Sequence, residues 1–198
     1  MSKSLYFLIH KPYKVLSQFT DEQGNPGLGS VFQLPKDVYP VGRLDLDSEG
    51  LLILTNDKRL NQSLLDPSRG HQRTYWVEVE GKPNQESLDQ LRNGIEINVN
   101  GKKHRTRKAQ AKIITPGIEE RIPPVNYRKH PERTWLEISL TEGKNRQVRR
   151  MTAKIGHPTL RLVRVAIESL HLAPLKSGEI TQLSEKSIYA KLAINKKP

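Results

Sequence analysis

The sequence contains no cysteine, so it has neither a disulfide framework nor a thiolate metal site. Long hydrophobic runs are missing as well, because no stretch approaches the ~18 apolar residues that suggest a transmembrane helix. The N-terminus lacks the apolar core and cleavage site of a signal peptide. We therefore expect a soluble protein of the reducing cytoplasm, with no membrane partner.

The sequence has few acidic residues: it contains 21 Asp and Glu against 33 Lys and Arg, and its net charge is +12. A polyanion is the natural partner of such a chain, because neutralising phosphates releases counterions and drives association. A charged surface that only keeps the protein soluble is the alternative, but an excess of this size favours nucleic acid. The 198 residues suffice for one domain, in one or two lobes.

Alternation of apolar and polar residues predicts several short strands, and helical periodicity with capping residues predicts three helices among them. No repeat and no linker between independent domains is visible, and the order is not a strict βαβ order. We predict an α+β fold built on a mostly antiparallel sheet. The expected strands are 4–9, 51–54, 73–81, 95–99, 134–141, 159–172 and 179–183; the expected helices are 84–94, 145–155 and one capped by Ser184; and 116–133 is expected to be a long exposed loop.

Three carboxylates, those of Asp45, Asp47 and Glu49, stand just before the apolar run 51–54. A calcium loop of the EF-hand type would need a bidentate Glu where Asn56 stands, and helices where the flanks look like strands. A second interpretation is that the carboxylates cap backbone amides in a turn. A third is chemical, since a carboxylate can attack a sugar carbon or stabilise an oxocarbenium-like centre. On a basic chain, the third interpretation points to the sugar or base of a nucleic acid.

The segment "GRLDLDSEGLLILTND" resembles the signature of the bacterial ribosomal pseudouridine synthases, in the branch of the small-subunit enzyme. The resemblance continues in "RTYWVEVEG" and in "EGKNRQVRRMTAKIGHPTLRLVRV", in the same order over nearly the whole chain. Within that branch the segment "HKPYKVLSQFTDEQG" is most similar to an enzyme that acts on the large ribosomal subunit. The absence of an N-terminal S4-type RNA-binding domain points the same way.

The resemblance implies a single pseudouridine synthase catalytic domain over residues 1–198. Its fold would have a mostly antiparallel central sheet with flanking helices and two lobes, approximately 1–66 and 67–198, around an active-site cleft. It would isomerise one uridine of large-subunit (23S) ribosomal RNA: the N-glycosidic bond breaks, the uracil turns, and C5 is joined to the ribose.

Nothing is added or removed in that reaction, so the resemblance implies no cofactor and no metal. The six histidines agree with this, because they show no paired ligand spacing. We expect a monomer. Small-subunit rRNA stays open as the substrate, and so do two other classes of protein: a non-catalytic rRNA-binding or assembly protein, and a hydrolytic nucleoside glycosidase.

By their places in the matched motifs, Asp45 is the implied nucleophile, Tyr75 the active-site tyrosine and Arg149 the cation that pairs with Asp45. Tyr75 would pack on the target base, and with an ordinary pKa near ~10 it is a weak base at pH 7. Arg149 would lower the pKa of Asp45 and orient its carboxylate. The alternatives are a half-buried strand tyrosine and a solvated basic helix face. Asp47 and Glu49 are interpreted as loop residues.

A target uridine must leave its stack, at a cost of a few kcal/mol, so contacts elsewhere on the RNA have to offset this. Backbone amides at the start of the 145–155 helix are candidates to bind a phosphate. The candidate substrate-binding side chains near the site are Arg43, Lys144, Arg146 and Arg150, and the more distant candidates are the basic run 102–112, the loop 121–133, and Tyr127 and Trp135 as stacking partners.

Overall fold

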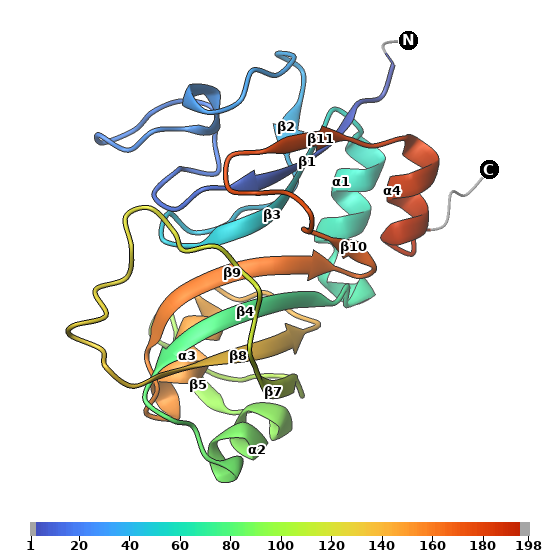
Figure 1. Cartoon of the computed structure of the whole chain (residues 1–198). Coiled ribbons are helices and arrows are strands. Elements are labelled where there is room, and N and C mark those ends of the chain that lie inside the picture. Colours follow the sequence, from blue (N-terminus) through green and yellow to red (C-terminus); the bar gives the residue numbers. More distant parts are fainter. Residues whose placement is uncertain (1–2, 195–198) are drawn as a thin grey trace. The chain divides into compact units, whose positions relative to one another are not determined.

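The computed structural model describes residues 3–194 and divides the chain into two compact units (Figure 1). The first unit takes the chain up to His71 and again from Arg164, and the second unit is Gln72–Val163. Strand β9 (Thr159–Ile167) begins in the second unit and ends in the first. That residues 1–198 act as one catalytic domain with lobes 1–66 and 67–198 around a cleft stays a prediction.

In the first unit, β1 has an antiparallel partner on each side, because it lies between β11 and β3. Short strands extend this arrangement, since β2 pairs with β3 and β10 with the end of β9. All seven residues of β3 are buried, as its apolar composition indicates. The bounds are β1 Tyr6–Lys11, β2 Tyr39–Pro40, β3 Glu49–Thr55, β10 Leu170–His171, β11 Ile180–Gln182, α1 Lys58–Leu65, α4 Glu185–Lys191 and the 3-10 helices Leu28–Ser30 and Pro67–Arg69.

Helix α1 was not among the helices predicted from the sequence. Its N-cap is Asp57, whose Oδ1 accepts hydrogen bonds from the amides of Arg59 at 2.9 Å and Leu60 at 3.2 Å. Its other oxygen accepts from the hydroxyls of Tyr6 at 2.8 Å and Tyr189 at 2.6 Å. Burial alone raises the pKa of Asp57, but these four hydrogen bonds outweigh it and lower the pKa. Asp57 therefore has a structural role.

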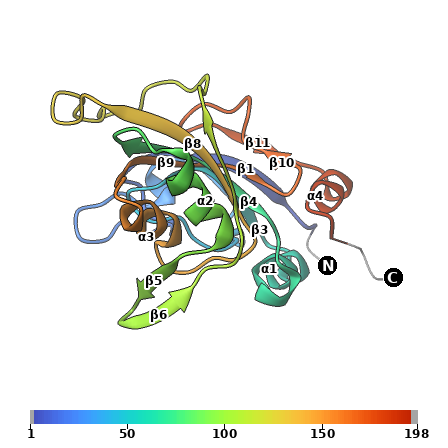
Figure 2. The ribbon, with the colours of Figure 1, turned by 90° about the horizontal axis from the view of Figure 1, so that it is seen from below.

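The second unit is a sheet covered on one face by two helices. Strands β4, β8 and β7 are antiparallel neighbours, and residues of α2 and α3 pack on β4 and β8 in one buried cluster (Figure 2). The hairpin β5–β6 lies beside α3. The bounds are β4 Arg73–Glu80, α2 Gln85–Asn93, β5 Glu96–Val99, β6 Lys102–Arg105, β7 Gln110–Ile114, β8 Arg133–Leu140 and α3 Gln147–Lys154.

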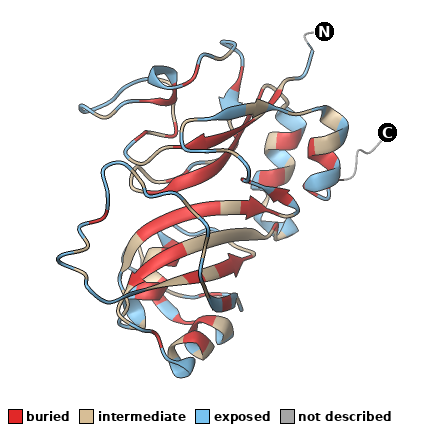
Figure 3. Ribbon diagram, in the orientation of Figure 1, coloured by how far each residue is buried: buried red, intermediate tan, exposed pale blue. Residues whose placement is uncertain are grey.

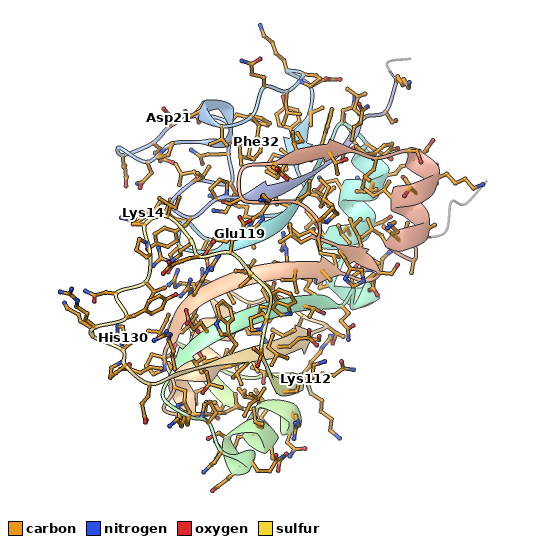
Figure 4. All side chains as sticks on the ribbon, in the orientation of Figure 1. Lys14, Asp21, Phe32, Lys112, Glu119 and His130 are labelled. Carbon is orange, nitrogen blue, oxygen red and sulfur yellow. The ribbon has the colours of Figure 1, made fainter. Side chains whose placement is uncertain are left out.

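The predicted loop 116–133 is present between β7 and β8, but it is not exposed along its whole length (Figure 3). Val125 is buried, and the ring of Tyr127 lies 3.9 Å from the guanidinium of Arg133. His130, labelled in Figure 4, approaches the carboxylate of Glu80 at 3.1 Å. These contacts dock parts of the loop on the second unit, which proline content alone does not reveal.

The predicted α+β class is confirmed, and every strand pair with an assigned register among residues 3–194 is antiparallel.

Candidate active site

The segment that carries Asp45 is a tight turn between β2 and β3. Gly42 takes a φ of +72°, which favours glycine, and the amide of Ser48 donates to the carbonyl of Asp45 at 3.0 Å. The side chain of Asp45 is half-buried, while that of Arg43 is exposed. The turn therefore places one carboxylate at the entry to a fully buried strand.

A buried hydroxyl fixes the backbone next to Asp45. The amide of Leu44 donates to Ser17 Oγ at 2.9 Å, and Ser17 Oγ donates to the carbonyl of Leu44 at 2.7 Å. On the other side of Asp45, the carbonyl of Leu46 accepts from the amide of Lys14 at 2.9 Å. Asp45 is thus held between two backbone positions that are tied to the segment 14–17. Neither tie was predicted from the sequence.

A fully buried lysine supplies positive charge to this region. Lys11 Nζ donates to the carbonyls of Pro12 at 2.9 Å and Val15 at 2.6 Å. Burial lowers the pKa of Lys11 to about 8, although the negative charges of Glu49, Asp47 and Asp45, in that order, oppose the change. Sequence analysis missed Lys11, because a lysine that ends a strand looks like a surface residue. The sequence did contain one sign of Lys11: the carboxylates of Asp45, Asp47 and Glu49 stand close together and need a positive charge nearby.

The interpretation of Glu49 as a loop residue is wrong. Glu49 begins β3 and is 1% exposed, so it belongs to the buried charge around Lys11. The next residue, Gly50, has a φ of +108°, and a Cβ there would overlap with the carbonyl oxygen of Arg164. Arg164 is itself buried and donates from Nε to the carbonyl of Leu51 at 2.8 Å. The entry to β3 is therefore a packed, charged layer in which glycine is required.

Tyr75 and Arg149, the other two predicted catalytic residues, lie in the second unit. Tyr75 stands opposite Ile138 in the β4–β8 register and packs, half-buried, against the cluster that contains Val77. Arg149 is half-buried in the first turn of α3, and its carbonyl accepts from the hydroxyl of Thr152 at 3.2 Å. The roles of Tyr75 and Arg149 stay predictions.

The predicted start of the 145–155 helix is displaced, because Arg146 has a φ of +50° and serves as the N-cap of α3. Arg146 and Lys144 are both exposed. Arg150 is engaged within the unit: Nη1 donates to the carbonyl of Asn98 at 2.7 Å, and Nε and Nη2 donate to Asn145 at 3.0 and 3.2 Å. An arginine side chain has five N–H groups, and these three bonds leave two N–H groups of Arg150 for other partners.

The structure thus describes Asp45 and Arg43 within the first unit, and the remaining predicted site residues within the second. The pairing of Asp45 with Arg149, and the position of Tyr75 beside them, stay predictions. Within residues 3–194 there is no group of three or more His, Asp and Glu side chains that could hold a metal ion. Over the same residues, no helix is both long and apolar enough to cross a membrane.

Comparison with known proteins gives matches along most of the chain. A sequence profile described as RNA pseudouridylate synthase matches residues 5–154. A protein of Xanthomonas axonopodis pv. citri (strain 306), named ribosomal large subunit pseudouridine synthase E, is 51% identical over 171 residues, which are 85% of this chain and 88% of that protein. A protein of the same name from Vibrio vulnificus (strain CMCP6) is 48% identical over 178 residues, which are 89% of this chain and 74% of that protein.

A solved structure described as a pseudouridylate synthase superposes with a TM-score of 0.78. The match is 24% identical and covers 97% of this chain and 75% of that one. At this level of identity the similarity shows a shared fold, and it confirms the fold predicted from the sequence.

Proposed function

The chain belongs to the RNA pseudouridylate synthase family, and from this premise we propose that it converts one uridine of large-subunit (23S) ribosomal RNA into pseudouridine. The family predicted from the motifs is confirmed. The names of the Xanthomonas and Vibrio relatives refer to the large ribosomal subunit, and this supports the proposed substrate.

An rRNA substrate supports a cytoplasmic location. A monomer that needs neither metal nor cofactor is part of the proposal.

The observation that carries the proposal is the fixed turn around Asp45. A nucleophile must be held in its attacking geometry, and the ties of Leu44 and Leu46 to segment 14–17 hold the backbone on both sides of this carboxylate. The charge of Lys11 reduces the cost of crowding three carboxylates at the entry to β3.

In the proposed reaction a carboxylate oxygen of Asp45 bonds to C1′ of the target ribose while the C1′–N1 bond breaks. The uracil anion turns, C5 bonds to C1′, and the carboxylate leaves. C5 then loses its proton and N1 gains one, so the product is an isomer of the substrate. Tyr75 would pack on the turning base, and Arg149 would orient Asp45 and favour its ionised form.

Exposed cations would hold the RNA while the uridine leaves its stack. Arg43 in the first unit and Lys144 and Arg146 in the second are exposed, as binding to phosphate requires. Arg150 would contribute through the N–H groups that it does not use on Asn98 and Asn145.

The proposal is tested by mapping pseudouridine on unmodified large-subunit rRNA, with pseudouridine-specific chemistry and reverse-transcription stops. The native protein is expected to give one new stop, and Asp45→Asn to reduce the rate at least ~10³-fold while RNA binding is kept. Asp47→Asn is the matched control, because it removes the same charge from the same turn; it is expected to stay within about tenfold of the native rate.

Each other outcome points to one of the rival functions. A stop that occurs in small-subunit rRNA alone would overturn the substrate and keep the chemistry. Release of free uracil would indicate a hydrolytic glycosidase. Tight binding without any modification would indicate a non-catalytic rRNA-binding or assembly protein.

A further inference from the structure

One buried carboxylate joins two basic segments of the second unit. Glu142 Oε1 accepts from the amide of Arg107 at 2.8 Å and from Gln147 Nε2 at 2.7 Å, and Oε2 lies 3.1 Å from His104 Nε2. The side chain of Glu142 is 9% exposed. The strand β6 with the residues after it is thereby tied to the loop that precedes α3.

Both carboxylate oxygens of Glu142 are engaged by partners within this junction. Burial alone raises the pKa of Glu142, but the hydrogen bonds from Arg107, Gln147 and His104 outweigh it, so that the pKa lies below its ordinary value. Two further bonds stiffen the junction: the amide of Lys144 donates to Gln147 Oε1 at 2.9 Å, and Arg150 Nη1 reaches the carbonyl of Asn98 on β5. The two segments are therefore held in a fixed relation to each other.

The hairpin β5–β6 turns one face to the core and the other to solvent. Ile97 is buried in the cluster with α3, and its register partner His104 points to Glu142. Because side chains alternate along a strand, Lys103 and Arg105 stand on the opposite face. Lys103 binds Glu96 at 3.2 Å, both well exposed, so this pair contributes little to stability.

The cations at this junction project into solvent. We name them the hairpin–helix surface; its members are exposed and are Lys102, Lys103, Arg105, Arg107, Lys108, Lys144 and Arg146. Two acids contact its members: Glu96 pairs with Lys103, and Glu142 accepts from the backbone amide of Arg107. The Glu142 junction brings the basic run and the α3 loop, which are distant in the sequence, next to each other, so that their exposed cations form one strongly positive region.

We propose that the hairpin–helix surface binds the phosphate backbone of the substrate RNA; the proposal rests on the proposed function for the identity of that RNA. Lysine and arginine side chains in solvent bind phosphate oxygens most readily, so we assign to this surface contacts with phosphates and not the reading of bases. Contacts of this kind raise affinity and set the register of the RNA, and they leave the chemical step unchanged.

The test is a triple variant that combines Arg105→Gln, Arg107→Gln and Lys108→Gln. The bond from the Arg107 amide to Glu142 involves the backbone, so the substitutions leave it in place. The matched control removes the same charge from three exposed lysines of the first unit, with Lys36→Gln, Lys58→Gln and Lys186→Gln. KM and kcat for rRNA modification, and Kd by filter binding, are measured from 50 to 200 mM KCl.

The triple variant is expected to raise KM and Kd at least tenfold with kcat within twofold. Three lost phosphate contacts should also reduce the slope of log Kd against log salt by about 2, at about 0.7 per contact with single-stranded RNA. The control is expected to change Kd less than threefold. Equal effects of the two triple variants would overturn the proposal, because they would show that RNA binding depends on the net charge of the protein and not on this surface.

Glu142→Ala separates positioning from simple attraction. This variant adds one unit of net positive charge, so a long-range attraction alone predicts tighter RNA binding. If Glu142 positions the surface, Kd rises several-fold instead, and circular dichroism shows that the fold is kept. Tighter binding would overturn the positioning role.

The outcomes also distinguish this proposal from the proposed function. If the native protein makes no pseudouridine but the triple variant Arg105→Gln, Arg107→Gln, Lys108→Gln still loses RNA binding, the surface stands and the proposed function fails. If the triple variant modifies RNA with unchanged KM, the surface fails and the proposed function stands.

Discussion

At the scale of single residues, Ser17 is a side chain outside the proposed chemistry that fixes the backbone next to the proposed nucleophile, Asp45. Its buried hydroxyl bonds to both the amide and the carbonyl of Leu44, the residue directly before Asp45. A change of this hydroxyl therefore acts on the backbone next to Asp45, the proposed nucleophile.

We predict that Ser17→Ala lowers the free energy of unfolding by about 1–3 kcal/mol, because it leaves buried backbone groups of Leu44 unpaired. It should also lower kcat by about 10- to 100-fold through displacement of Asp45. Urea unfolding and single-turnover modification measure the two effects. Ser48→Ala is the control, since Ser48 Oγ is buried in the same turn and has no hydrogen-bond partner among the described residues. Equal results for the two variants would contradict the anchoring role.

Lys11 gives the protein a pH dependence of stability with a defined sign. Its pKa is about 8 in the folded protein against 10.5 ordinarily, so the unfolded chain binds more protons between these values. The free energy of unfolding contributed by Lys11 therefore rises with pH across that window, by at most about 3 kcal/mol. Below pH 8 both states hold the proton, and above 10.5 neither does, so the contribution is constant there.

Lys11→Met is expected to remove this rise, although it lowers stability overall by leaving two buried carbonyls unpaired. The measurement is the difference in the free energy of unfolding between pH 8 and pH 10.5, in the native protein and in the variant. Parallel curves would show that Lys11 is not the group responsible.

At the scale of elements, β3 depends on one glycine. Gly50 has a φ of +108°, and a Cβ there would meet backbone atoms of Arg164, which cannot move aside as a flexible side chain can. We predict that Gly50→Ala costs roughly 3 kcal/mol or more, from backbone strain and overpacking together. Thermal and urea unfolding measure it.

Gly24→Ala is the matched control in the same unit. Gly24 has a φ of +75° but no heavy atom within 4 Å of the place of a Cβ, so only the strain of about 1–2 kcal/mol remains. A similar loss in both variants would show that the close approach of β3 to Arg164 is not what requires glycine at position 50.

Helices with clear local signals were predicted correctly from the sequence. Asn84 and Ser184 cap α2 and α4 through side-chain bonds to Ser87 and Ser187, three residues ahead. Helix α1 was missed although Asp57 caps it, because Asn56 and Asp57 also read as the end of the preceding apolar run. The start of α3 was placed too early, since the positive φ of Arg146 is set by its surroundings and leaves no sign in the sequence.

At the scale of the whole molecule, the net charge of +12 is fixed by composition, but its arrangement is not. The basic run 102–112 looks like an ordinary solvated strand in the sequence. Part of it comes to lie near Lys144 and Arg146 through contacts between distant residues, such as the bond from the Arg107 amide to Glu142 at a separation of 35 residues. Long-range contacts of this kind cannot be inferred from local patterns.

The sequence by itself determined the α+β class, the family and the place of Asp45 in its motif, because periodicity, capping residues and motif order are properties of short segments. The tertiary structure alone decided that Lys11 and Glu49 are buried, that Ser17 anchors Leu44, and that Gly50 must be glycine. Each of these depends on what another part of the chain brings to the residue. The physical reason is that burial is a property of the neighbourhood in space, and it makes a charge or a hydroxyl a structural element where the sequence shows only a polar residue.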